Sequence, residues 1–340
     1  MNTKLIAEIS GNHLGSLDIC LSLVKAAKLS GASMVKLQTY TPETMTLPLQ
    51  TPEYSISKDH NLWGGQSLFD LYSKAHTPWH WHKELFDYAN EIGIQIFSTP
   101  FDKSAVDLLE VLNTPLYKIA SLESGDIPLI RYIASTNKPI IASTGASTLQ
   151  EIDELVEAVF SEGNEQLTLL LCTSAYPTPL NQVHLNKMNL LSKRYNLPIG
   201  LSDHTLGTTA SLAAVARGAT VIERHFTLDR KAGGLDSVFS LEPNELTDLV
   251  NQIQEVELCL GNEDWVIQSN ESESRRLRRS LIITKPVQKG DIVSNENVKS
   301  LRPNIGMEPK YLEKILGRNF ADSFDVGTPL TFDKVLNKEP

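Results

Sequence analysis

The chain has 340 residues, of which 41% are hydrophobic and 21% are charged. At roughly 150 residues per domain, this length predicts one large domain and one small one, and the composition excludes disorder as the dominant state. The 31 Lys and Arg against 41 Asp and Glu leave a net charge of -10, which excludes a broad nucleic-acid footprint and requires any anionic ligand to be bound locally.

Short β-rich runs alternate with helical stretches along most of the chain. Near-continuous apolar strands between helices predict a parallel sheet covered by helices, and eight of them predict a closed (β/α)8 TIM barrel, an α/β fold. The alternative is a doubly wound sheet, but the turn after the first strand lacks the glycine fingerprint of that fold. The expected strands are residues 4–9, 33–39, 94–99, 116–121, 139–144, 167–173, 198–202 and 220–226.

Several helices between these strands have recognisable starts. Ser16 and Asp102 are each expected to cap a helix. Ser147 and Gln150 have the spacing of a capping box ahead of another helix. The apolar period over residues 246–260 is typical of an amphipathic helix, and we expect it to be the last helix of the barrel.

A connection of about 40 residues, from Thr41 to His80, separates the second strand from its helix. It contains several prolines, glycines and aromatic residues. Connections of this length in a compact domain are usually functional. In a barrel this one follows the carboxyl end of a strand, so we expect a loop on the catalytic face that acts as a lid.

The composition changes towards the carboxyl end of the chain. The polar segment 263–280 ends in RRLRRS and predicts a linker, with its arginines solvated or in an inter-subunit contact. Short strand-like pieces and turn signals over residues 281–340 predict a small β-rich domain. Residues 1–262 are therefore expected to form the catalytic barrel domain.

The three cysteines lie far apart, and the chain has no C-x-x-C motif. This pattern predicts neither a disulfide framework nor a structural zinc site, and it is typical of a reducing, cytoplasmic compartment. No segment has the pattern of a signal peptide or a membrane span. We therefore expect neither a membrane nor a nucleic acid as partner.

Polar residues occur at the carboxyl ends of all eight expected strands. Active-site groups of a barrel come from these ends and from the loops after them. One such residue alone is usually a surface group or a helix cap, but polar residues at every end favour an active site. They are Glu8, Lys36, Gln38, Thr99, Lys118, Ser121, Glu123, Ser143, Thr144, Ser174, Tyr176, Ser202, Asp203, His204, Glu223 and His225.

Two lysines, Lys36 and Lys118, lie inside the apolar runs VKLQ and YKIA. Lysine is rarely buried unless it is paired, so these two would either form Schiff bases, as in lysine aldolases, or bind a phosphate. Nearby hydroxyl groups favour the phosphate. His204 and His225 end neighbouring strands, where their rings could meet at one divalent metal ion or be ordinary hydrogen-bonded histidines.

Eight motifs in chain order resemble the sialic acid synthase family, the phosphoenolpyruvate-dependent nonulosonate synthases. They are IAEISGNHLGS, VKLQT, FSTPFD, YKIAS, STGAS, CTSAYPTP, GLSDHT and ERHFT. The resemblance covers about residues 4–336, and its last part is similar to the antifreeze-like (SAF) domain of those enzymes. The motifs CTSAYP, DSVFSLEP, RRSL, LFDLY and TPWHWHKEL resemble the pseudaminic acid synthase branch more than the N-acetylneuraminate branch.

This resemblance implies a transferase that condenses phosphoenolpyruvate with an N-acetylated amino sugar. For the pseudaminic acid branch the sugar is 2,4-diacetamido-2,4,6-trideoxy-L-altrose, and the alternatives within the family make N-acetylneuraminate or legionaminate. Such products serve cell-surface glycans, including glycosylated flagellin. A Schiff-base aldolase on the same barrel, and a carbohydrate-binding protein without turnover, are the alternatives from other classes.

The matched motifs imply a role for individual residues. Phosphoenolpyruvate would be bound by Lys36, Thr99, Lys118, Ser121, Ser143 and Ser202. The sugar would face Glu8, Gln38, Ser174, Tyr176, Asp236 and Arg302. His204 and His225 would bind a divalent ion, typically Mn²⁺ with Mg²⁺ or Co²⁺ as alternatives. Together with Glu123 as general base they would form the catalytic set.

Two of the matched positions bear on the subunit arrangement and on the branch of the family. Arg302 matches an arginine that in the family reaches the partner subunit's site, from the C-terminal domain of a domain-swapped homodimer. The neuraminate branch carries asparagine where this chain has Ser174, and a serine there suits the pseudaminic acid branch.

Overall fold

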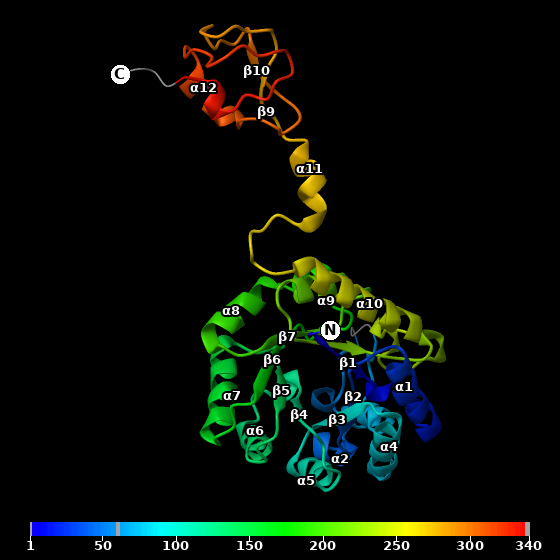
Figure 1. Ribbon diagram of the computed structural model, residues 1–340. Coiled ribbons are helices and arrows are strands. Elements are labelled where there is room, and N and C mark those ends of the chain that lie inside the picture. Colours follow the sequence, from blue (N-terminus) through cyan, green and yellow to red (C-terminus); the bar gives the residue numbers. More distant parts are fainter. Residues whose placement is uncertain (1, 59–61, 337–340) are drawn as a thin grey trace. The chain divides into compact units, whose positions relative to one another are not determined.

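Eight parallel strands close into a barrel, which confirms the predicted fold (Figure 1). β8 pairs with β1 and closes the sheet, with Glu223 opposite Ile6. Every strand begins and ends within two residues of its expected range. The strands are β1 (Lys4–Glu8), β2 (Met34–Thr39), β3 (Gln95–Pro100), β4 (Tyr117–Ile119), β5 (Ile140–Ser143), β6 (Leu167–Cys172), β7 (Ile199–Asp203) and β8 (Val221–His225).

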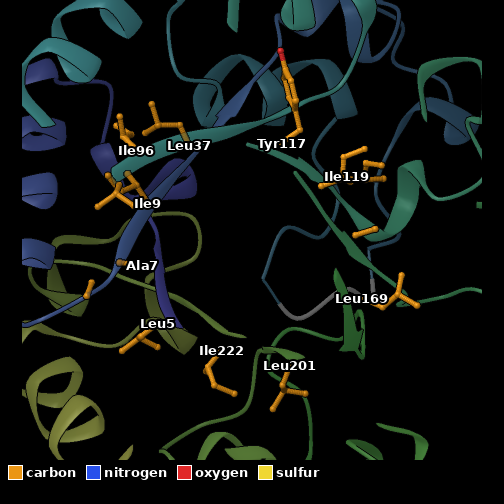
Figure 2. Close-up of a cluster of buried hydrophobic side chains, with 14 of the residues drawn as sticks. Leu5, Ala7, Ile9, Leu37, Ile96, Tyr117, Ile119, Leu169, Leu201 and Ile222 are labelled. Carbon is orange, nitrogen blue, oxygen red and sulfur yellow. The ribbon is translucent and has the colours of Figure 1, made fainter. Parts of the chain in front are cut away.

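The computed structural model describes residues 2–58 and 62–336, in two units divided between Gly261 and Asn262. In the first unit, helices surround the barrel (Figure 1), and the outward side chains of the strands pack against them as the main core (Figure 2). These helices are α1 (Leu17–Leu29), α4 (Trp79–Ile92), α5 (Lys103–Val111), α6 (Ile127–Ala134), α7 (Leu149–Ser161), α8 (Asn186–Tyr195), α9 (Thr209–Ala216) and α10 (Pro243–Leu260).

Two of the three expected helix caps are confirmed. The side chain of Ser16 accepts a hydrogen bond from the backbone N–H of Ile19, and Asp102 caps α5 in the same way. The last barrel helix, α10, contains the predicted residues 246–260 and starts three residues earlier, at Pro243.

The prediction for the start of α7 was wrong. The cap is Thr148 rather than Ser147, and Glu151 rather than Gln150 completes the capping box. Thr148 has the extended backbone that a cap requires. The hydroxyl of Ser147 is used instead in a 2.8 Å hydrogen bond with the hydroxyl of Ser124.

The sequence predicted a loop between β2 and α4, but only part of this connection is a loop. It contains two helices, α2 (Pro42–Met45) and α3 (Leu68–Ala75), and an antiparallel bridge between Ser55 and Ser67. Residues 59–61 of this connection lie outside the described residues. The described part is therefore a folded structure at the carboxyl ends of the strands.

The second unit has its own apolar core, which includes Leu281, Ile283 and Phe320. Its two named strands, β9 (Ser280–Ile283) and β10 (Val298–Leu301), pair antiparallel. It also contains the short helices α11 (Ser272–Arg276) and α12 (Leu312–Ile315). None of the helices in the described part of the chain combines the length and apolar composition needed to cross a membrane.

The barrel interior begins with an apolar layer. Side chains alternate between the two faces of a strand, so every second residue faces the barrel axis. On β7 this position is Gly200, where an added Cβ would lie only 2.2 Å from the carbonyl oxygen of Val221 and 2.6 Å from Leu170 Cδ2. The matching residues on the other strands, or directly before the strand in the case of Leu116, are Ile6, Met34, Phe97, Leu116, Ile141, Leu170 and Val221.

Candidate active site

A polar layer lies two residues further along each strand. The same alternation that turns the apolar layer inward also turns these residues inward, toward the carboxyl ends of the strands. Each of these residues is at most 8% exposed. The members of the polar layer are Glu8, Lys36, Thr99, Lys118, Ser143, Cys172, Ser202 and Glu223.

Four charged side chains of the polar layer form a continuous chain of ion pairs. The Nζ of Lys36 lies 2.9 Å from Glu8 Oε2 and 3.4 Å from Glu223 Oε2. The other carboxylate oxygen of Glu223 lies 3.9 Å from the Nζ of Lys118. Two carboxylates and two ammonium groups balance formally, so each buried charge has an opposite charge beside it.

Burial disfavours the charged form of all four groups, and the balance between burial and the neighbouring charges decides whether each pKa rises or falls. Burial acts to raise the pKa of Glu223, but Lys118 and Lys36 hold it at about 2. Burial acts to lower the pKa of Lys36, but Glu223 and Glu8 outweigh it and the pKa is raised. For Lys118, burial prevails and lowers the pKa. Lys118 is therefore the lysine whose charge gains most from an anionic ligand.

Hydroxyl groups surround the two ammonium groups. Lys118 Nζ donates to the hydroxyl of Ser143 at 2.6 Å, and Lys36 Nζ lies 3.4 Å from the hydroxyl of Thr99. The hydroxyl of Ser121, at the start of the turn after β4, accepts from a backbone N–H at 3.1 Å. These donors and cations together match the needs of a small phosphorylated anion.

The two histidines are adjacent, as predicted. The ring centroids of His204 and His225 are 5.2 Å apart, and the ring of Tyr176 lies 4.5 Å from that of His204. Burial lowers the pKa of His225 well below its ordinary value, so its ring is neutral near pH 7. Among the described residues, its buried Nδ1 has no hydrogen-bond partner, and Asp236 Oδ2 is 3.6 Å away.

These features of His225 fit a ligand of a divalent ion. Burial acts to lower the pKa of His204, but its contact with Cys172 outweighs burial and raises the pKa, so an ion bound there would displace a proton. A neutral imidazole with an unshared buried nitrogen is the form that binds metals. The described residues contain no group of three or more His, Cys, Asp or Glu side chains placed to hold an ion. An ion at His204 and His225 would therefore complete its coordination with water or substrate oxygens.

Two carboxyl groups near the histidines and lysines have pKa values in the neutral range. Burial raises the pKa of Glu123 to about 7, against the opposing effect of Lys118. Burial and the charge of Glu8 raise the pKa of Asp236 to about 7, and Ser10 donates a hydrogen bond to its carboxylate. Carboxyl groups of this kind can exchange protons near pH 7.

A cavity of about 390 Å³ joins these groups at the carboxyl ends of the strands. Two predicted residues, Glu8 and Thr99, contact Lys36 and are not among those that line the cavity. Ser174 lines a neighbouring cavity, and Arg302 belongs to the second unit. The predicted residues that line it are Lys36, Gln38, Lys118, Ser121, Glu123, Ser143, Tyr176, Ser202, His204, His225 and Asp236.

Two members of the polar layer make contacts that the sequence did not predict: Glu223 was expected only as one of the polar strand ends, and Cys172 was not among the expected residues. Glu223 is a central ion-pair partner, and its position two residues before His225 on one strand was the signal that both face inward. Cys172 has its Sγ 3.9 Å from His204 Nδ1. Burial acts to raise the pKa of its thiol, but the interaction with His204 outweighs it and lowers the pKa to about 7.

Comparison with known proteins finds a matching family model for each of the two units. Residues 23–264 match the family model described as the NeuB family, and residues 278–336 match the SAF domain model. The pseudaminic acid synthase of Helicobacter pylori is 40% identical over 333 residues, which are 98% of this chain and 97% of that protein.

Further relatives carry related names. The N,N'-diacetyllegionaminic acid synthase of Campylobacter jejuni is 38% identical over 322 residues, or 93% of this chain and 95% of that protein. The crystal structure of an N-acetylneuraminic acid synthetase from Leptospira borgpetersenii in complex with citrate has a TM-score of 0.72 and 29% identity, covering 81% of this chain and 90% of that chain. The barrel, its polar layer and these matches together show that the chain belongs to the NeuB family, with a SAF domain after the barrel.

Proposed function

We propose that the protein is a pseudaminic acid synthase. It condenses phosphoenolpyruvate with 2,4-diacetamido-2,4,6-trideoxy-L-altrose and water, and it releases pseudaminic acid and phosphate. The observation that carries this proposal is the buried polar layer, in which Lys36 and Lys118 face one cavity among hydroxyl groups. The 40% identity to a synthase of that name, over nearly the whole chain, supports the choice of sugar.

Phosphoenolpyruvate fits the charges of the cavity floor. It carries a phosphate and a carboxylate, and it needs two cations and several donors at fixed positions. Lys118 binds one of these groups together with Ser143 and Ser121, and Lys36 binds the other. Because burial lowers the pKa of Lys118, the bound anion also restores the ammonium form of that lysine.

Carbon–carbon bond formation joins C3 of the enol to the aldehyde carbon of the open-chain sugar. His204 and His225 would hold the divalent ion, for which we propose Mn²⁺, beside the cavity. Polarisation of the aldehyde oxygen is the chemistry that such an ion supplies when bound. Holding both substrates in one cavity also makes the encounter effectively unimolecular.

Water then adds at C2 and the phosphate leaves. We assign the general base to Glu123, which lines the cavity and has a pKa of about 7. A carboxylate with this pKa takes up a proton near neutral pH more readily than an ordinary one. In the described residues its buried Oε2 has no hydrogen-bond partner, so one oxygen is available to a water molecule.

Phosphate release from phosphoenolpyruvate with Mn²⁺ tests the proposal against a panel of amino sugars. Release with 2,4-diacetamido-2,4,6-trideoxy-L-altrose is expected, and Lys118→Met should abolish it while the exposed Lys83→Met leaves it unchanged. Release only with N-acetylmannosamine or with the legionaminate precursor would move the assignment to the corresponding synthase. Absence of phosphate release with every sugar of the panel would reject the synthase.

The Schiff-base alternative has its own test. A lysine with a lowered pKa, such as Lys118, is the kind that attacks a carbonyl carbon. The proposed condensation forms no Schiff base, so borohydride reduction in the presence of pyruvate or the sugar should leave the mass of the protein unchanged. A stable adduct on Lys36 or Lys118 would favour the aldolase.

We also propose that the protein acts as a domain-swapped homodimer. The support is the SAF domain match over residues 278–336, which contains the exposed Arg302. In this arrangement Arg302 of one protomer reaches the sugar in the partner's cavity.

A further inference from the structure

The cavity has two chemically different parts. Its floor carries the charges and hydroxyl groups of the polar layer. A second part is formed by the connection between β2 and α4, and the lining that this connection contributes is apolar or aromatic. That lining, here called the apolar wall, consists of Met45, Ile56, Trp63, Leu68, Leu71, Tyr72 and Ala75.

The apolar wall is attached firmly to the barrel. Leu71 is 8% exposed, and the carbonyl oxygen of Ala75 lies 3.2 Å from Nε2 of the buried His13. The ring of Tyr72 packs edge-on against that of Tyr40, which follows β2, at 5.7 Å between centroids. The wall is thus a built surface of the cavity, so it can select among ligands by shape and polarity.

The chemistry fixes the direction of a bound sugar. The aldehyde carbon of the acceptor must meet the enol carbon of phosphoenolpyruvate, which is held at the polar floor by Lys36 and Lys118. The opposite end of the six-carbon chain is then the part farthest from the floor. That end carries the C4 and C6 substituents, and it is the part that contacts the second part of the cavity.

We infer that the apolar wall selects acceptors with a methyl group at C6. This inference rests on the proposed function and names the residues that set its specificity. The deoxy carbon buries apolar surface against Leu68, Leu71 and Met45. A hydroxyl group at C6 would lose water there, and no wall residue carries a charged or amide side chain to replace it. The hydrogen-bonding side-chain groups of the wall are the hydroxyl of Tyr72 and the ring N–H of Trp63, which already donates to the carbonyl oxygen of Leu235 at 3.1 Å.

The expected discrimination follows from this chemistry. An apolar pocket rejects an isostere that adds one hydroxyl group by about 100-fold at most. The wild-type protein should therefore prefer the 6-deoxy acceptor over its 6-hydroxy counterpart by about tenfold to 100-fold in kcat/KM. The comparison needs two acceptors that differ only at C6, namely 2,4-diacetamido-2,4,6-trideoxy-L-altrose and 2,4-diacetamido-2,4-dideoxy-L-altrose.

The variant Leu68→Gln tests the wall itself. It places an amide among the lining side chains, and the preference for the 6-deoxy sugar should fall about tenfold. Met45→Gln makes the same change from α2, in case Leu68→Gln does not fold. The matched control is Leu47→Gln in the same connection, because Leu47 is 53% exposed and does not line the cavity. Its preference should equal that of the wild type.

Each outcome decides a separate statement. Equal kcat/KM of the wild type for the two sugars would overturn the inference while leaving the synthase intact. So would variants at Leu68 and Met45 that lower the rate with both sugars by the same factor, since the wall would then act only in packing. No phosphate release with either sugar would instead overturn the proposed function.

Discussion

Glu223 lies between the two interior lysines, with Oε2 3.4 Å from the Nζ of Lys36. The carboxylate is almost fully buried, and its other oxygen faces Lys118 and accepts from the hydroxyl of Ser202 at 2.9 Å. It therefore places one negative charge between both lysines before any anion binds, and Glu8 supplies the second beside Lys36. When phosphoenolpyruvate is bound, the same carboxylate is a negative charge close to an anionic ligand, which makes Glu223 a positioning residue rather than a binding one.

Glu223→Gln should separate these two effects. Removal of the carboxylate loosens both lysines and should lower kcat on the order of 100-fold, while KM for phosphoenolpyruvate falls because a nearby negative charge is gone. Breaking the buried pair should also reduce the free energy of unfolding by about 3 kcal/mol. Steady-state kinetics and urea unfolding measure the two quantities, and Asp87→Asn, in an exposed pair with Lys83, should change neither. A rise in KM with unchanged kcat would contradict this role.

The activity should depend on pH through Glu123. Its pKa is raised to about 7, so the carboxylate is protonated at pH 6 and ionised at pH 8. A general base works only when ionised, and kcat/KM should therefore rise with pH through about 7. Asp236 has a similar pKa, so the profiles of Glu123→Gln and Asp236→Asn must be compared. The rise should be lost in the former; its survival there would assign the base elsewhere.

Mn²⁺ binding should depend on His225. After removal of metal by a chelator, titration followed by electron paramagnetic resonance should show one bound ion in the wild type. His225→Ala should weaken the affinity by at least about tenfold, since one of two protein ligands is lost. The exposed His80→Ala serves as control and should bind Mn²⁺ normally. Equal affinity of all three proteins would reject the site at His204 and His225.

A shared active site should permit complementation between inactive protomers. Arg302→Ala and Lys118→Ala each remove one contribution to a shared site. Mixed dimers then contain one site that carries both changes and one that carries neither. After unfolding and refolding together, the mixture should recover roughly a quarter of the wild-type activity. Activity no higher than that of the separate variants would argue against the swap.

The apolar layer beneath the site should tolerate no larger residue than glycine on β7. In Gly200→Ala the new methyl group would meet a backbone oxygen at 2.2 Å, so the strands must shift. The free energy of unfolding should fall by about 1–3 kcal/mol or more. Gly125→Ala adds the same group where nothing lies within 4 Å, and it should change stability by less than about 0.5 kcal/mol. Urea unfolding of both variants distinguishes the two positions.

The barrel was predictable because its signals are local. Each strand is a largely apolar run with polar residues at or near its carboxyl end, and the period of two decides which side chains face inward without reference to any other strand. The polarity of Lys36 and Lys118 within such runs was therefore enough to place both in the interior. The start of α7 was missed because two adjacent hydroxyl residues compete for the cap, and only contact with Ser124 decides that Ser147 is used elsewhere.

The folded structure of the connection between β2 and α4 was not predictable in the same way. Its helices are short, and a short helix gains most of its stability from packing against the rest of the protein. Leu71 looks like any other apolar loop residue until α3 lies against the barrel. The apolar wall therefore follows from tertiary contacts, as does the attachment of Ala75 to His13.

The sequence by itself determined the order of the strands, the parity of their side chains and the residue types at their carboxyl ends. Only the tertiary structure decided which of these side chains are neighbours. Closure of the barrel places Glu223 beside Lys36, although 187 positions separate them in the chain. The pKa values of such buried groups depend on partners a few ångströms away. The charges at the site are therefore a property of the fold, whereas the groups that carry them are a property of the sequence.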